Sequence, residues 1–227
     1  MVVLLLILTV FLCVLVDWVG HRDEYRVTDT LLPFPENREP APSIQTAGFH
    51  LQSDRLLHPG HSWVMQEGPA RVRVGIDDFA RRLVGGIDFV DLPKVGDRVV
   101  QGKPAWVLHN GNRRVPMLSP ITGEVVAVNP RIRTDAGLVK TASYTEGWLF
   151  SVRSPDLRTS LNNLLGGDLL KKWLEASSSR LRLRVNPMPH ISFPDGGTVI
   201  EDISTVVDEE RWKNLVREFL LTEPEVM

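Results

Sequence analysis

Residues 85–93 decide the fold class, and they read GGIDFVDLP. Two glycines precede an alternating run of apolar and acidic residues, and Pro93 closes it. Alternation with a period of two is typical of a strand with one buried face. A β-strand is therefore predicted between Ile87 and Leu92.

Short runs of the same kind recur from about residue 61 to residue 152. They are rich in β-branched and aromatic residues, and they read RVRV at 71–74, AWVL at 105–108, EVVAV at 124–128 and WLFSV at 148–152. Glycine, proline and asparagine separate them. One interval, Asp77 to Val84, has a helical pattern that Asp77 or Asp78 could cap. The fold class predicted is mainly β, a sandwich or flattened barrel.

Several longer blocks resemble those of the glycine cleavage H-protein family. In chain order they read HSWV at 61–64, GIDDFA at 75–80, FVDLPKVGD at 89–97, SPITGEVV at 119–126 and YTEGWL at 144–149. They match the family's blocks in order and without a gap, and a helical segment at 161–174 fits the family's C-terminal helix. The resemblance implies a flattened β-barrel of lipoyl-domain type with flanking helices, over residues 56–178.

The resemblance also implies where the chemistry should be. In that family a lysine stands on a hairpin seven positions before the Ser-Pro pair, and lipoic acid is joined to its amine to carry an aminomethyl group. In this chain that position is Asn112, whose carboxamide is not a nucleophile. Arg113 and Arg114 follow, and a guanidinium stays protonated and does not replace a free amine. No lysine stands between Lys103 and Lys140, so the sequence predicts that no lipoyl cofactor is attached.

The hairpin tip itself has two interpretations. Asn110-Gly111 is a preferred pair for a type I′ turn. Asn110, Gly111, Asn112, Arg113 and Arg114 then form either a solvated turn or a basic docking tip for an acidic partner. The sequence does not decide between them.

The N-terminus has the character of a membrane anchor. Residues 1–16 carry no polar side chain except Thr9, and with residues 17–19 they would give a helix of about 28 Å, close to the thickness of a bilayer's hydrocarbon core. A cleaved signal peptide is disfavoured because the basic first segment and the small-residue cleavage site are missing. Residues 1–20 are therefore predicted to be a single transmembrane helix that binds membrane lipid. Arginines 22, 26 and 38 place the domain in the cytoplasm and the N-terminus outside the inner membrane.

Residues 21–55 and 179–227 flank the predicted domain. The first segment holds four prolines between residues 33 and 42 without sustained periodicity, which predicts an extended tether. In the second, RLRLRV at 180–185 alternates and predicts an edge strand or an extended basic strip. Further on, Asp208 can cap an amphipathic helix. Its apolar stripe consists of Trp212, Leu215, Val216, Phe219 and Leu220. This stripe docks either on the chain's own core or in a groove of another protein.

Composition argues against other classes. The net charge of −2 does not indicate a nucleic-acid surface. The single cysteine, Cys13, allows neither an internal disulfide nor a multi-cysteine metal site, and the Pro-Gly between His58 and His61 does not suit metal ligands. No catalytic triad, phosphate-binding glycine loop or paired catalytic carboxylates are recognised, so an enzyme is not expected.

Three functions are compatible with these features. The preferred one is a membrane-anchored, non-lipoylated module that serves as a structural or protein-binding accessory subunit of a larger membrane complex, such as a respiratory or photosynthetic one. The alternative is a true lipoyl carrier of a glycine cleavage-type system, modified at Lys103 or Lys140. A third is a regulator that sequesters a partner of the true carrier by mimicking its surface.

Overall fold

The computed structural model describes residues 41–185 and 200–226. All of the described residues belong to one of the two units into which the chain divides, Ala41–Met227. The predicted membrane anchor at 1–20 and the first part of the predicted tether lie outside the described residues. Within the described ranges, no helix is long and apolar enough to span a bilayer.

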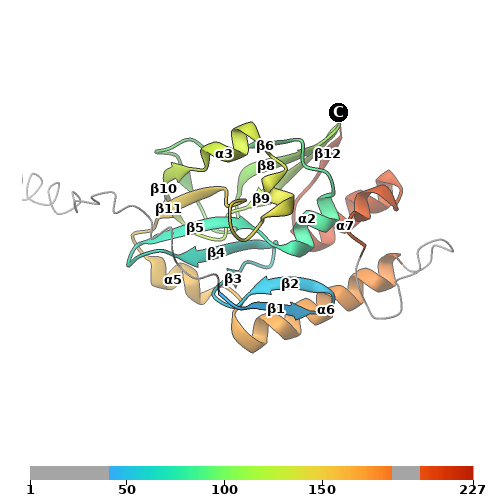
Figure 1. Cartoon of the computed structure of the whole chain (residues 1–227), viewed down its shortest axis with the longest axis horizontal. Coiled ribbons are helices and arrows are strands. Elements are labelled where there is room, and N and C mark those ends of the chain that lie inside the picture. The colour runs from blue at the N-terminus through green and yellow to red at the C-terminus, as the bar shows by residue number, and fades with distance from the viewer. Residues whose placement is uncertain (1–40, 186–199, 227) are drawn as a thin grey trace, which may run out of the picture. The chain divides into compact units, whose positions relative to one another are not determined.

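Most of the described elements are strands (Figure 1). The strands are β1 Ser43–Thr46, β2 Phe49–Gln52, β3 Leu56–Leu57, β4 Ser62–Gln66, β5 Arg71–Ile76, β6 Phe89–Asp91, β7 Arg98–Val99, β8 Pro104–Asn110, β9 Arg113–Leu118, β10 Gly123–Val128, β11 Phe150–Arg153 and β12 Glu225–Val226. The helices are α2 Asp78–Val84, α3 Pro130–Thr134, α4 Leu138–Thr141, α5 Leu157–Asn162, α6 Gly167–Val185, the 3₁₀ helix η1 Ile203–Thr205, and α7 Glu209–Leu220.

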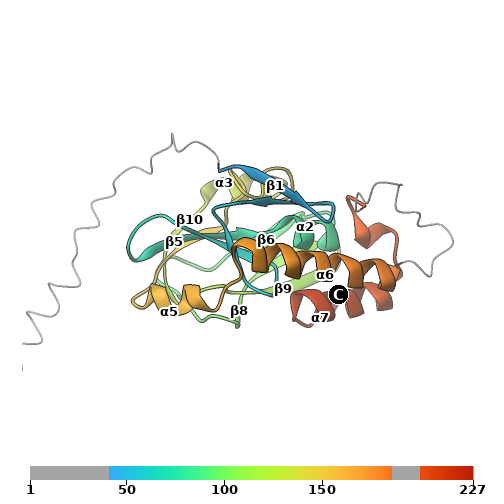
Figure 2. The same cartoon turned by 90° about the horizontal axis from the view of Figure 1, so that it is seen from below.

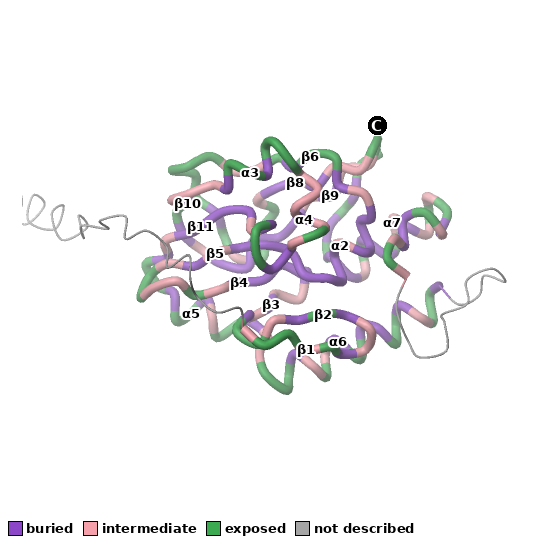
Figure 3. Tube along the Cα trace, viewed as in Figure 1, coloured by how far each residue is buried: buried purple, intermediate pink, exposed green. Residues whose placement is uncertain are grey.

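Two antiparallel sheets form the body of the domain. One has the strand order β3-β4-β5-β11-β10-β7, and the other has the order β12-β9-β8-β6. Their buried side chains contribute to one core, and Figure 3 colours the buried residues of the chain purple. Strands alternate between buried and less buried residues, as Val72 and Val74 do on β5. The prediction of a mainly β fold with flanking helices is confirmed, and the architecture is consistent with a lipoyl-type domain.

Two residues of the recognised motifs, Trp63 on β4 and Gly75 on β5, pair across the two strands. Trp63 is fully buried, and its indole Nε1 donates to the carbonyl of Ser143 at 3.2 Å. The ring lies directly over Gly75, where a Cβ atom would collide with it. This close approach explains why glycine, with no side chain, stands at position 75.

The predicted helix at 77–84 is confirmed as α2. Asp77 is its N-cap and accepts a hydrogen bond from the backbone N–H of Ala80 at 2.8 Å. The other carboxylate oxygen of Asp77 lies 2.7 Å from Nδ1 of His61, a buried residue whose ring stacks on Phe79. One carboxylate therefore caps the helix and also binds His61, the residue just before β4.

The tether prediction is wrong for its last residues. Strands β1 and β2 pair as a hairpin, and Phe49 and Leu51 enter the core. The backbone N–H of His50 donates to Asp78, and the hydroxyl of Tyr144 donates to the carbonyl of His50. Each of these strands has only four residues and follows a run of prolines, so their alternation is too short to stand out.

The strand prediction for residues 180–185 is also wrong, because these residues complete helix α6. Leu181 and Val185 are four residues apart and buried, whereas Leu183 is 75% exposed. In such a short segment, a spacing of four residues fits a helix face as well as every second position of a strand. Helix α6 packs beside β1 and beside α7 (Figure 2).

Candidate functional site

The hairpin of β8 and β9 is the candidate site. Asn110 pairs with Arg113, so the loop consists of Gly111 and Asn112. Gly111 has φ of 55°, and Asn112 is not among the residues with positive φ. A positive φ at only the first loop residue is the pattern of a type II′ turn. The hairpin is confirmed, but the predicted type I′ turn, centred on Asn110 and Gly111, is displaced by one residue.

Only the two loop residues are exposed at this tip. Asn112 presents its carboxamide there, and the arginines that follow it are half-buried. The tip is fixed from the other side as well. The Nδ2 atom of Asn110 donates to the carbonyl of Val84 at 2.7 Å, and the backbone N–H of Gly111 donates to Asp88 at 2.7 Å. The loop is therefore held in one place relative to the end of α2.

Arg113 is bound to the C-terminal part of the chain. Its Nε donates to Glu209 at 2.9 Å, and its Nη1 donates to the carbonyl of Ser204 at 3.1 Å. The guanidinium carbon lies 4.4 Å from the ring centroid of Trp212, a cation–π arrangement. Arg113 therefore joins the hairpin to η1 and α7.

Arg114 makes a simpler contact on the outer side. Its Nη1 lies 3.0 Å from Glu225 on β12, which pairs with β9. Both arginines are paired with acidic residues of the chain itself, whereas both interpretations of the tip assumed free guanidinium groups. A docking role for the tip stays a prediction, and the exposed groups that could serve it are those of Gly111 and Asn112.

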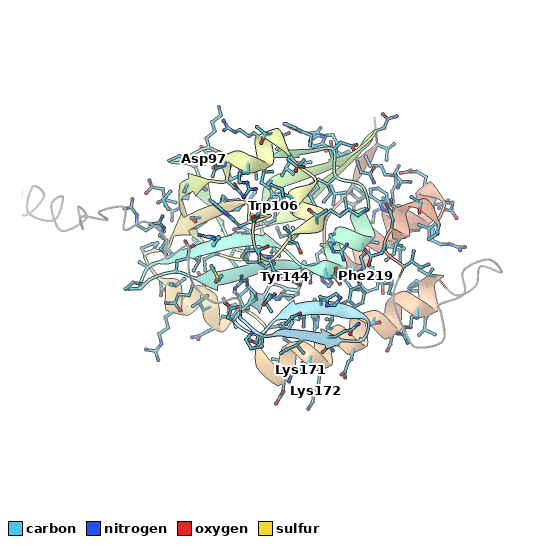
Figure 4. All side chains as sticks on the ribbon, viewed as in Figure 1. Asp97, Trp106, Tyr144, Lys171, Lys172 and Phe219 are labelled. Atoms are coloured by element: carbon cyan, nitrogen blue, oxygen red, sulfur yellow. The ribbon has the colours of Figure 1, made fainter. Side chains whose placement is uncertain are left out.

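Helix α7 is the predicted amphipathic helix, with Asp208 as its N-cap. All five residues of its predicted stripe, Trp212, Leu215, Val216, Phe219 and Leu220, are buried within the chain itself. The Nε1 of Trp212 donates to the carbonyl of Leu83 at 3.0 Å. Figure 4 shows Phe219 directed into the body of the domain from α7. The helix therefore docks on its own chain, and this face is not available to a groove of another protein.

Acidic residues just before α7 complete the contact with α2. Glu201 pairs with Arg81 at 2.9 Å and with Arg82 at 3.3 Å, and Asp202 lies 3.8 Å from Lys140. The loop approaches so closely that a Cβ atom on Gly85 would meet the side chains of Asp202 and Ser204. Sequence reasoning missed these contacts. The signal available in the sequence was the acidic composition of residues 201–225, which suits contact with the arginines of the domain.

Comparison with known proteins assigns the domain that carries this hairpin. A family model described as "Glycine cleavage H-protein" matches residues 55–177, more than half of the chain. The chain belongs to the glycine cleavage H-protein family. The resemblance seen in the sequence motifs is thereby confirmed, and residues 55–177 are called the H-protein domain below.

Two sequence relatives agree with this assignment, and one solved structure is also similar to part of the chain. The glycine cleavage system H protein of Pectobacterium atrosepticum is 37% identical over 115 residues, covering 51% of this chain and 88% of the relative. That of Xanthomonas campestris is 39% identical over 125 residues, covering 55% of this chain and 95% of the relative. A crystal structure of an H protein from Mycobacterium marinum is 29% identical, with a TM-score of 0.44, and covers 47% of this chain and 88% of that one.

The two lysines that flank the hairpin in sequence lie away from its tip. Lys103 is exposed in the turn that precedes β8, whereas Asn112 follows the other end of β8. The seven residues of β8 separate them by about 23 Å at 3.3 Å per residue. Lys140 is half-buried on α4, beside Asp202. Neither lysine takes the place of an amine at the tip of the H-protein domain.

The histidines dismissed as metal ligands have other partners. His61 contacts Asp77, and Nδ1 of His58 accepts a hydrogen bond from the backbone N–H of Gly60 at 3.0 Å. Burial, with a smaller effect from His61, lowers the pKa of His58. Among the described residues, no cluster of three or more histidine, cysteine or acidic side chains could hold a metal ion.

Proposed function

We propose that this chain is a non-lipoylated member of the H-protein family that acts as a structural or protein-binding module and not as an enzyme. The observation that carries the proposal is the carboxamide of Asn112 at the tip of the β8–β9 hairpin. Acyl transfer needs a nucleophile with a free lone pair, and the nitrogen of an amide shares its lone pair with the carbonyl. No group at this tip can accept a lipoyl chain.

The contacts around the tip support a structural use of the hairpin. In this chain β9 binds α7 and β12 through Arg113 and Arg114, so the hairpin anchors the C-terminal segment. The apolar residues at 1–16 support the further proposal that the domain is tethered to the inner membrane as an accessory subunit of a larger complex. Its partner would then be another subunit of that complex.

The attachment of lipoic acid is tested by intact mass. The full chain is co-expressed with lipoylating enzymes, with the H protein of Xanthomonas campestris as a positive control. We expect the unmodified mass for this chain under conditions that fully modify the control. A mass increase of one lipoyl group on this chain would contradict the proposal.

The role as a subunit is tested separately by purification from native membranes in mild detergent. We expect a second protein in stoichiometric amount. Recovery of the chain in soluble extracts, or as a lone monomer in detergent, would count against the membrane-complex role without affecting the result on lipoylation.

A second candidate, a lipoyl carrier modified elsewhere, is favoured by family membership. The relatives named above are glycine cleavage system H proteins, and the chain covers most of their length. Lys103 is the better acceptor, because it is exposed whereas Lys140 is half-buried and near Asp202. If a modified mass is found, Lys103→Arg and Lys140→Arg variants identify the lysine, since only one of them should return the chain to its unmodified mass.

A further inference from the structure

The chain's own C-terminal segment covers one edge of the hairpin. Strand β12 pairs with β9 in the register Glu225 with Arg114 and Val226 with Arg113. Arg113 is adjacent to Asn112, so the covering strand reaches the last paired position before the tip. Without β12, the edge of β9 would offer unpaired backbone N–H and C=O groups to a protein that binds the hairpin.

The inner side of the tip is occupied by the same segment. Ser204 accepts from Arg113 through its carbonyl at 3.1 Å, and its hydroxyl lies 3.4 Å from Nδ2 of Asn110. Glu209 and the ring of Trp212 enclose the rest of the Arg113 side chain. Residues on both strands beside the tip are thus engaged by residues 200–226.

An enzyme that modifies a lysine must enclose its amine in an active site. A lysine side chain is only a few ångströms long, so such an enzyme also contacts the residues on either side of the modified position. Next to position 112, Arg113 already binds the C-terminal segment, and so does Asn110, two residues before it, whereas Gly111 is exposed. Such an enzyme would meet the C-terminal segment beside the exposed tip, with β12 along the outer edge of β9 and η1 and α7 on its inner side.

We propose that residues 200–226 shield the hairpin tip from modification, so that a lysine restored at position 112 is not lipoylated while β12 is paired. The inference rests on the proposed non-lipoylated function and extends it. The loss of carrier chemistry would then have two independent causes, the missing amine and the covered hairpin.

The test compares three chains co-expressed with lipoylating enzymes. The first is the full chain with Asn112→Lys. The second carries the same change and ends after Thr222, which removes β12 but keeps α7. The third is the full-length Asn112→Lys chain with Val226→Pro, which weakens the pairing of β12 because proline has no N–H to donate. Intact mass and the mass of the peptide that contains position 112 give the modified fraction.

We expect at least a tenfold lower modified fraction for the full-length Asn112→Lys chain than for the two chains with β12 removed or weakened. Equal fractions in all three, whether high or low, would overturn the shielding role of β12. A cooperative thermal transition in each variant checks that it is folded, and the Val226→Pro chain decides if the shortened chain does not fold. The unsubstituted chain is measured alongside, because its lipoylation would refute the proposed function and leave this comparison intact.

Discussion

Two regions of the H-protein domain match the family in different ways. Around β4, β5 and α2, residues of the family motifs are buried and bonded to each other, as Trp63 over Gly75 and Asp77 at the start of α2 show. At the tip of the β8–β9 hairpin, the residue in the functional position is the exposed Asn112. The first region contributes to the core, whereas the two tip residues, Gly111 and Asn112, are exposed.

The difference shows that these motif matches are evidence for the packing of the core and not, by themselves, for the chemistry of the hairpin tip. A buried tryptophan, glycine or capping carboxylate is required by its neighbours, so replacing it costs stability whatever the protein does. An exposed loop residue has few such neighbours, so its replacement costs the domain little stability. The motif matches therefore establish membership of the family, and they do not by themselves establish the carrier role.

The largest effect is expected where the hairpin has gained a structural role. Trp212→Ala removes a fully buried ring that binds the carbonyl of Leu83 and lies beneath Arg113. Loss of an aromatic side chain from a core typically costs about 3–5 kcal/mol of the free energy of unfolding. Urea denaturation of the two full chains measures the difference.

The matched control is Glu210→Ala, which changes an exposed residue two positions earlier on the same helix. Its free energy of unfolding should stay within about 0.5 kcal/mol of the unsubstituted chain. If Trp212→Ala also changed stability by less than about 1 kcal/mol, α7 would not be an integral part of the domain, and the contrast between the two regions would fail.

A smaller effect is expected in the motif region from Gly75→Ala. The added Cβ collides with the ring of Trp63, which is fully buried and cannot move aside. Overpacking of this kind typically destabilises by about 1–3 kcal/mol. Gly68→Ala is the matched control, because nothing lies within 4 Å of a Cβ atom there. Similar denaturation midpoints for the two variants would show that Gly75 is not required by packing.

The sequence predicted the parts of this molecule that depend on local patterns. The strands at 71–74, 105–108 and 124–128, the cap at Asp77 and the helix after Asp208 are all found. Each of these elements has either a repeated spacing of apolar residues or a capping residue. Both features depend only on residues that are close in sequence. The strand predicted at 87–92 is shorter, covering Phe89–Asp91.

Apart from residues 180–185, where the local spacing was ambiguous, the failures came from contacts between distant parts of the chain. The use of residues 43–52 as a hairpin depends on Phe49 reaching the core and on Tyr144, 94 residues later, bonding His50. The sequence left the arginines of the hairpin tip as either a solvated turn or a docking tip, because their partners Glu209 and Glu225 are about a hundred residues away in sequence. No local spacing encodes such pairs, so the pairing of Arg113 and Arg114 with these glutamates could not be predicted residue by residue.

The smallest effect concerns Tyr144, a motif residue with a titratable group. Its hydroxyl donates to the carbonyl of His50 at 2.8 Å and accepts from the backbone N–H of Asp78 at 3.1 Å. Tyr144→Phe leaves both groups without this partner, which should cost about 1–2 kcal/mol at pH 8. Burial, more than the nearby charge of Asp77, raises the pKa of Tyr144 well above its ordinary value of 10.0.

A raised pKa has a definite consequence for stability at alkaline pH. Above pH 10 the unfolded chain releases the phenol proton while the folded chain retains it, so the stability that the hydroxyl contributes below pH 10 is lost as pH rises. The phenylalanine variant has no such proton. Urea denaturation of both chains from pH 8 to alkaline pH should therefore show a difference that shrinks above pH 10, by up to about 1.4 kcal/mol per pH unit. A difference that stays constant would mean that Tyr144 ionises as readily in the folded domain as in water. The motif region would then be more open than its packing implies.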